Sequence, residues 1–238
     1  MFFSIINIEG DFMKKEKYYT YTLDTVILNV LALVLVFALI IIVGFTYPGN
    51  LLAIDMNDII IMILWMILHE IIHAIGFFSS KTVKKENVTM GMFLEKGIFY
   101  CMCKQEIPKK TILFSLVLPL TTIGIITLIL GYIFSSSLLV FLSIVNISGC
   151  IGDIMMTIFM FKLPKDIKYL DLDDPTSFTI ISKEDISNVK TLGIIKKDSG
   201  IYDKSKMYAK NKKKIDISKM SLIFLISMIV IYILTLFI

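Results

Sequence analysis

The 238-residue chain has no arginine, one tryptophan, two histidines and three cysteines. All 24 basic residues are therefore lysines, and with abundant isoleucine this composition is typical of a low-GC bacterial source. The odd number of cysteines (Cys101, Cys103 and Cys150) argues for free thiols rather than disulfides. Imidazole chemistry can come only from His69 and His73.

Apolar sequence is what the chain has in excess. It is 56% hydrophobic, with a mean hydropathy of +0.81, which is more than one soluble core requires. The excess lies in five runs that reach or nearly reach the roughly 20 residues needed to cross a hydrocarbon core about 30 Å thick. These runs are residues 25–46, 59–78, 111–134, 138–161 and 220–238. Because a helix satisfies its own backbone in lipid, we expect an all-α integral membrane bundle of about five transmembrane helices.

The first run could be mistaken for a signal peptide. It is longer than a typical signal core, and no small-x-small cleavage site follows it before Pro48, so we expect an uncleaved anchor. The lysines then indicate orientation, because every one lies in residues 1–24, 79–110 or 162–219 and none in the connections 47–58 and 135–137. By the positive-inside rule, the lysine-bearing segments and the N-terminus are cytoplasmic in a multi-pass cell-membrane protein. The net charge of +4 then belongs to the cytoplasmic face and does not indicate nucleic-acid binding.

The predicted organisation is one membrane core, residues 25–161, preceded by a cytoplasmic N-terminal tail, residues 1–24. The first insertion, 79–110, is predicted to form a small cytoplasmic β-hairpin around Glu95-Lys96-Gly97, with strands near 88–94 and 98–103. The second, 162–219, is acidic and then Lys-rich, with a strand near 177–181 and no fold assigned to 190–215. Its Lys-rich part is either a solvated linker or a binding site for anionic lipid headgroups. Residues 220–238 form the predicted last transmembrane helix.

The two histidines belong to one motif, His69-Glu70-Ile71-Ile72-His73. On a helix, positions i and i+4 share a face about 5–6 Å apart, so both imidazoles can bind one Zn²⁺ while Glu70 acts as base on a zinc-activated water. The alternative is simple packing of these side chains between helices. It is disfavoured, because an ionisable group at the centre of a membrane helix costs roughly 2.5–3.5 kcal/mol and three such groups are clustered here.

A catalytic zinc site requires a third protein ligand, and Asp153 is the strongest candidate. It is the only acidic residue within the fourth apolar run. His73 and Asp153 both lie near the predicted cytoplasmic ends of their helices. At about 1.5 Å per residue, they differ in depth by roughly one helical turn.

Other residues near Asp153 are candidates for supporting roles. Asn146 and Cys150 precede it on one helical stripe. Asn146 either orients a ligand, holds substrate backbone or makes a simple interhelical hydrogen bond, and Cys150 is more consistent with small packing than with a ligand. Gly149 and Gly152 are expected to allow close approach of a neighbouring helix. Weaker alternatives for the third ligand are the acidic residues of the first insertion, Glu86, Glu95 and Glu106. Cys101 and Cys103 could bind metal as a pair, but one C-x-C without a partner pair is a weak signal, and alternate residues of a strand are the favoured interpretation.

The residues HEIIHAIG (69–76) and GCIGDI (149–154) resemble a bacterial family of zincin peptidases, membrane proteins of similar length with HExxH in one helix and a GDI-type motif in a later one. The acidic stretch DLDDPTSFTII (171–181) is similar to the segment that follows that motif in the family. More distantly, the layout resembles the site-2 protease clan of intramembrane metalloproteases. That resemblance implies zinc held by His69, His73 and Asp153, with Glu70 as general base. The sequence departs from the clan pattern, because no proline separates Asn146 from Asp153 and no Leu-Asp-Gly follows. The class of membrane proteases with Glu-Glu and Arg motifs is excluded by the absence of arginine.

These features together predict a membrane-embedded zinc metalloendopeptidase that hydrolyses peptide bonds near the cytoplasmic face of the bilayer. Its partners would be membrane lipids and a peptide or membrane-protein substrate, with no nucleic acid. One alternative is a non-catalytic membrane immunity or regulatory protein that retains a structural zinc site. The other is a transporter with buried ionisable residues along an ion path. The sequence lacks the paired broken helices that a transporter should have.

Overall fold

A computed structural model describes residues 16–49, 51, 56–93 and 98–203 of the chain. Three predicted features lie outside the described residues: the last transmembrane run at 220–238, the Glu95-Lys96-Gly97 turn, and the end of the Lys-rich segment. The statements below concern the described residues.

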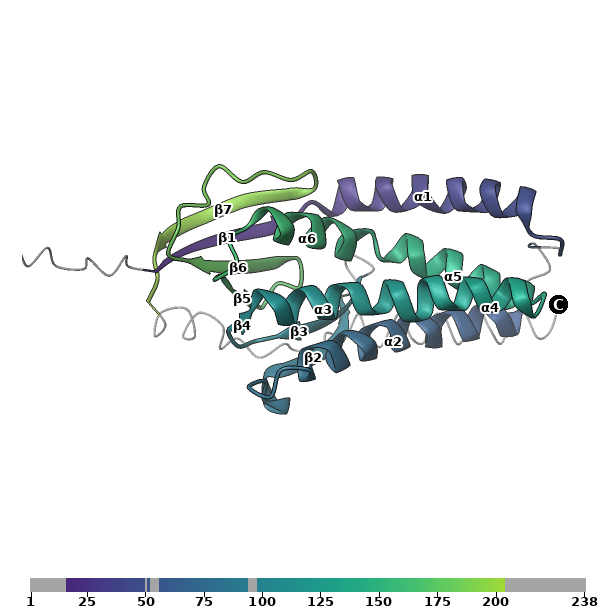
Figure 1. Ribbon diagram of the computed structural model, residues 1–238, viewed down its shortest axis with the longest axis horizontal. Coiled ribbons are helices and arrows are strands. Elements are labelled where there is room, and N and C mark those ends of the chain that lie inside the picture. Colours follow the sequence, from purple (N-terminus) through teal and green to yellow (C-terminus); the bar gives the residue numbers. More distant parts are fainter. Residues whose placement is uncertain (1–15, 50, 52–55, 94–97, 204–238) are drawn as a thin grey trace, which may run out of the picture.

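Three helical stretches are long and apolar enough to cross a membrane, and Figure 1 shows that all three run along the long axis of the molecule. They are α1 (Thr25–Thr46), α2 (Met56–Phe78), and a composite of α3 (Lys109–Pro119), the π-helical segment η3 (Leu120–Ile126) and α4 (Thr127–Ile133). A fourth span is formed by α5 (Ser137–Gly149) and α6 (Ile151–Lys162) if the 45° bend between them belongs to one crossing. The chain is therefore a membrane protein.

The ends of α1 follow from local sequence. Asp24 is the N-cap, and its side chain accepts hydrogen bonds from the backbone N–H groups of Val26 and Ile27. Such a cap satisfies donors that have no partner inside the helix. Aliphatic residues then continue to Thr46, and the helix stops at Tyr47, directly before a proline that cannot extend it.

The prediction of an all-α bundle is wrong, because a five-stranded antiparallel sheet in the order β4-β5-β6-β1-β7 lies at one end of the helices (Figure 1). Its strands are β1 (Lys17–Leu23), β4 (Ile107–Pro108), β5 (Lys168–Asp171), β6 (Ser177–Ser182) and β7 (Ile194–Ile201). A separate two-stranded sheet pairs β2 (Val88–Phe93), which follows the short helix η1 (Lys85–Asn87), with β3 (Ile98–Cys103). The hairpin and the strand near 177–181 were predicted correctly, but the larger sheet was not.

Two segments for which no strand was predicted contribute strands to the larger sheet. The end of the N-terminal tail forms β1, which pairs with β6 on one side and with β7 on the other. The strand β7 falls inside residues 190–215, to which no fold had been assigned. The partners of β1 lie more than 150 residues away in sequence, so local patterns could not reveal the pairing.

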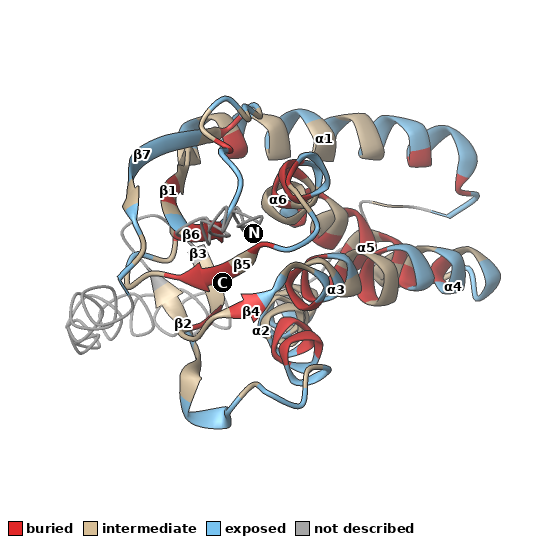
Figure 2. Ribbon diagram, turned by 60° about the vertical axis from the view of Figure 1, so that its left-hand side comes forward, coloured by how far each residue is buried: buried red, intermediate tan, exposed pale blue. Residues whose placement is uncertain are grey.

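The core is continuous between the sheet and the helices. The ring centroid of Tyr21 on β1 lies 4.8 Å from that of Phe159 on α6 and 5.7 Å from that of Phe178 on β6. All three side chains are buried. Figure 2 shows in red that much of β5 and α6 around them is buried as well. The sheet is therefore packed directly against the ends of the helices.

Candidate metal centre

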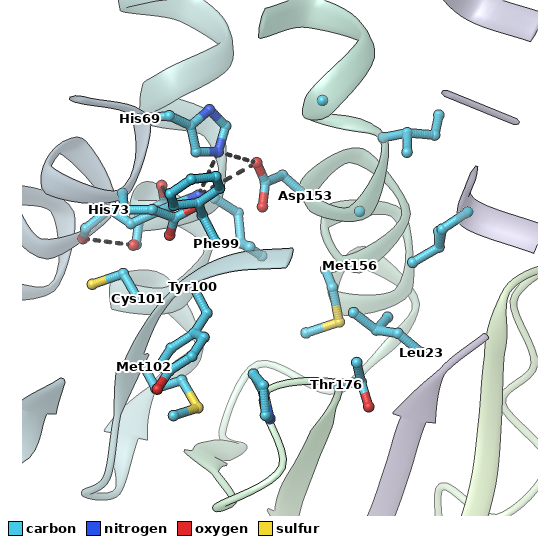
Figure 3. A pocket seen from close by; sticks show the side chains of 18 of the residues that line it. Leu23, His69, His73, Phe99, Tyr100, Cys101, Met102, Asp153, Met156 and Thr176 are labelled. Carbon is cyan, nitrogen blue, oxygen red and sulfur yellow. Dashed lines mark hydrogen bonds and ion pairs between the residues drawn. The ribbon is translucent and has the colours of Figure 1, made fainter. Parts of the chain in front are cut away.

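One side of α2 and the first turn of α6 bring together His69, His73 and Asp153. One ligand atom from each lies within 4.8 Å of the others. The two imidazole Nε2 atoms are 3.0 Å apart, and Asp153 Oδ2 is 3.3 Å from that of His69 and 3.4 Å from that of His73. Figure 3 shows the imidazoles reaching from α2 and the carboxylate from α6 toward the same point. Within the described part of the chain, no other group of three such side chains could hold a metal ion.

The tautomers of both histidines are fixed by their other ring nitrogen. His73 Nδ1 lies 2.9 Å from the backbone carbonyl of Ser115, which can only accept, so His73 donates. His69 Nδ1 lies 2.9 Å from Asn146 Oδ1. The Asn146 amide nitrogen donates to the Pro119 carbonyl, which leaves Oδ1 as the acceptor for His69. Each neutral imidazole therefore directs an unprotonated Nε2 at Asp153, the arrangement that outer hydrogen bonds impose on metal-binding histidines.

These donors fit a zinc ion. With both Nδ1 atoms protonated, neither Nε2 of a neutral ring has a hydrogen to share across the 3.0 Å between them. Asp153 Oδ2 is buried and has no hydrogen-bond partner, although it lies within ion-pair distance of both rings. Ligands about 2.0–2.1 Å from a tetrahedral zinc ion lie about 3.3 Å apart, which agrees with the separations seen here. A cation between these three electron-rich atoms would relieve their mutual repulsion, so the group could hold a metal ion.

Packing of α2 on α3 positions the histidines. The Ser115 hydroxyl donates to the His73 backbone carbonyl, 2.8 Å away, so Ser115 contacts His73 through both its main chain and its side chain. Gly76 makes this approach possible, because a Cβ at that position would lie 2.5 Å from the Cα of Ser115. The glycine of the HEIIHAIG stretch is therefore needed for the close contact that holds His73.

A partly open cavity of about 390 Å³ adjoins the three side chains. Glu70 lines it together with His69, His73 and Asp153, as the prediction of a base beside the metal requires. On the sheet side, the cavity is lined by residues 99–102 of β3, which Figure 3 shows facing Met156 of α6 and Thr176 of the β5–β6 loop.

The structure separates the remaining candidates. Cys150 is buried, with its sulfur 4.0 Å from His69 Nδ1 and 3.6 Å from Asn146 Nδ2, and so packs behind the ligands. Glu86 lies on the exposed surface near Lys84, and Glu106 pairs with Lys168 in the sheet region. Neither belongs to the metal-binding group.

No helix among the described residues approaches Gly149 or Gly152 closely, because a Cβ at either position would meet none of their atoms within 4 Å. The expected close approach of a neighbouring helix at these glycines stays a prediction. Both glycines line the cavity.

Sequence reasoning missed two residues near the centre. Ser115 acts on His73 partly through its backbone carbonyl, which no side-chain pattern can reveal. Asp171 is buried at the cavity wall, where it accepts hydrogen bonds from the Cys103 N–H at 2.7 Å and the Tyr169 hydroxyl at 2.5 Å. Burial raises the pKa of Asp171 to about 6. Its position at the start of the acidic stretch was the available signal.

The comparison with known families can now be placed beside this geometry. Residues 60–168 match the family model described as "Putative zincin peptidase". The resemblance inferred from the motifs is thus confirmed, over a little under half of the 238 residues. The match to this zincin family includes Glu70 and all three side chains of the candidate centre, and it implies zinc as the metal. No curated protein and no solved structure matches the chain.

Proposed function

We propose that this protein is a membrane-embedded zinc metalloendopeptidase. The observation that carries the proposal is the convergence of His69, His73 and Asp153 from helices about 80 residues apart, with both histidine tautomers set for metal binding. The match to a zincin peptidase family supports the same conclusion.

In this proposal, His69, His73 and Asp153 hold the zinc ion. When bound, zinc polarises the scissile carbonyl and lowers the pKa of the attacking water toward about 7. Glu70 accepts the proton of that water at its carboxylate and transfers it to the leaving amine. Asn146 and the Ser115 carbonyl keep the two imidazoles oriented throughout, because each accepts a hydrogen bond from the Nδ1–H of one ring.

The distribution of charge supports a cytoplasmic position for the reaction. All lysines of the described residues lie in the sheet, in its loops, in the hairpin region, or at the adjoining ends of α3 and α6. With this end on the cytoplasmic side, His73 lies five residues before the cytoplasmic end of α2. The cleaved bond would then lie near the cytoplasmic face of the bilayer, and the N-terminus would be cytoplasmic.

The β2–β3 hairpin is the element we expect to present the substrate. Among the described residues, β3 pairs as a strand only with β2, and its residues 99–102 line the cavity beside the metal group. An extended peptide can add to such an edge through main-chain hydrogen bonds. A peptide bound in this way would lie alongside the centre in an extended conformation.

The test is a comparison of wild type with Glu70→Gln, and with Glu86→Gln as a matched control on the exposed surface. Each protein is purified in detergent, loaded with zinc, and incubated with a mixture of synthetic peptides read by mass spectrometry. We expect Glu70→Gln to keep one zinc per chain and to lose cleavage by about 10²–10⁴-fold, while Glu86→Gln behaves as wild type. A zinc-loaded wild type that cleaves nothing beyond the zinc-free protein would instead indicate a structural zinc site in a non-catalytic membrane protein.

A further inference from the structure

The cavity extends well beyond the metal group along two helices that do not pack on each other. In the described part of the chain, α1 packs mainly on α5 and α6, whereas α2 packs on α3, α5 and β3. Both nevertheless line the same cavity with one face each, since the lining positions recur every three or four residues. These positions are Thr25, Leu28, Asn29 and Ala32 of α1, and Met62, Trp65, Met66 and His69 of α2. We call the space between these two faces the α1–α2 slot.

Between α1 and α2, two of the residues that line the slot are glycines, which have no side chain to fill it. Gly149 and Gly152 both line the cavity, and a Cβ at either position would meet nothing within 4 Å. The space over these glycines adjoins Asp153, the residue next to Gly152. A second polypeptide backbone can therefore approach closely at the point where the slot meets the metal group.

Two polar groups of this slot have no hydrogen-bond partner among the described residues, the buried indole N–H of Trp65 and the amide of Asn29. Asn29 is exposed, it interrupts the aliphatic run of α1, and its amide makes no hydrogen bond within the described part of the chain. An unsatisfied amide in a membrane helix is costly, so it indicates a partner outside the described part of the chain.

The depth of Asn29 matches that of the metal group. It lies four residues, or about 6 Å, from the start of α1, and His73 lies five residues, or about 8 Å, from the end of α2. Both helix ends are at the sheet end of the molecule (Figure 1). The amide and the zinc-binding side chains therefore lie in one layer of the same cavity.

We propose that the α1–α2 slot admits an apolar peptide segment from the lipid, and that Asn29 is a substrate-binding residue that hydrogen-bonds the backbone of this segment beside the metal group. The proposal rests on the metallopeptidase function above and defines its substrate class. An extended peptide offers both a carbonyl and an N–H, which an amide side chain can bind together, whereas a lipid acyl chain offers neither. The flexible side chains of Met62 and Met66 suit apolar residues of varied shape.

The single tryptophan makes occupancy of the slot measurable without zinc or catalysis. Trp65 lines the slot, so a quencher that enters it reduces the only indole fluorescence of the protein. The probe is a 20-residue leucine–alanine peptide with a central Gly-Pro pair, which leaves backbone groups without helical partners, and with a nitroxide label at one end. It is titrated into vesicles that contain the zinc-free full-length protein. We expect saturable quenching for wild type and about fivefold weaker binding for Asn29→Leu, the loss of one hydrogen bond within a membrane.

Two further variants separate Asn29 from a general change in the helix. The double variant Asn29→Leu/Val30→Asn keeps the amide but moves it off the slot face, and it should bind as weakly as Asn29→Leu. Gly149→Leu fills open space in the slot without displacing a neighbouring atom, so it should abolish saturable quenching. Equal binding by wild type and Asn29→Leu would overturn the assignment of Asn29.

Other occupants of the slot give different results. Quenching by nitroxide-labelled phospholipid that the peptide does not displace would identify a lipid site and overturn the proposal. The absence of quenching by either probe would also overturn it, because the slot would then be filled by another part of the chain, such as residues 220–238. Because the assay needs no zinc, peptide binding that persists while Glu70→Gln retains cleavage would count against the metallopeptidase and not against the slot.

Discussion

The two long helices α1 and α2 are both apolar enough to cross a membrane, yet they differ in what surrounds them. In the most apolar stretch of each, 11% of α1 is buried against 28% of α2. The more apolar helix therefore makes fewer contacts with the rest of the protein, while α2 carries the metal-binding histidines and packs closely on α3. Hydropathy identifies both helices as membrane spans, but it does not show which of them packs closely against the rest of the protein.

Matched glycine substitutions test this difference most strongly. Gly76→Ala places a Cβ 2.5 Å from the Ser115 backbone, so we expect a loss of about 3 kcal/mol in stability together with weaker zinc binding. Gly44→Ala in α1 meets no atom within 4 Å and should be neutral or stabilising by about 0.5–1 kcal/mol. Thermal unfolding in detergent measures both. Equal effects at the two positions would contradict the contrast between the helices.

Asp171 tests a second contact of α2 that α1 lacks. Its carboxylate accepts a hydrogen bond from Cys103 at the end of β3, the strand that packs on α2. Its pKa is raised from 3.8 to about 6, so the protonated form is favoured in the folded state. Protonated Asp171 therefore stabilises the folded state. This contribution to the free energy of unfolding is complete below about pH 3.8 and is lost as the pH rises through 6, a decline on the order of 2–3 kcal/mol. Unfolding measured from pH 4 to 7 should show this decline in wild type and a smaller one in Asp171→Asn. Parallel pH profiles would argue against a buried, protonated Asp171.

Two asparagines that line the cavity, Asn146 of α5 and Asn29 of α1, offer a smaller contrast. Asn146→Leu removes the acceptor that orients His69, and we expect zinc affinity to fall about tenfold to hundredfold. Asn29→Leu removes an amide of the same size that touches no ligand, so zinc affinity should not change. Competition with a chromophoric chelator measures both affinities. An Asn146 variant with the zinc affinity of wild type would show that His69 is oriented by other contacts.

The smallest expected effect is at the start of α1. Asp24→Ala removes the side chain that caps the first turn and should cost about 1 kcal/mol in unfolding experiments. Because the centre is held by α2, α3 and α6, zinc content should remain as in wild type. Loss of zinc in this variant would mean that α1 supports the metal site more directly than its packing indicates.

The helices and the candidate centre could be anticipated because both depend on local sequence. Residues 25–46 carry no charge, and α1 has the bounds of that run. The spacing of His69 and His73 fixes their common face on any helix, and Asp153 is the one acidic residue of its apolar run. Helix polarity and rise per residue then place Asp153 at a similar depth.

The larger sheet could not be anticipated in the same way. The partners of β1 are distant in sequence, and β1 and β7 lie next to either an apolar run or many lysines. The surroundings of Gly149 and Gly152 could not be anticipated for a related reason. A glycine in a membrane helix permits either close packing or open space, and the neighbouring helices decide which one.

Metal content of the purified full-length protein tests the central claim most directly, measured for wild type, His73→Ala and Asp153→Ala by elemental analysis. Joint coordination by α2 and α6 predicts one zinc per chain in wild type and its loss in both variants. Zinc retained at one per chain in Asp153→Ala would show that the third ligand is another residue, and a zinc-free wild type that cannot be loaded would contradict the metal centre itself.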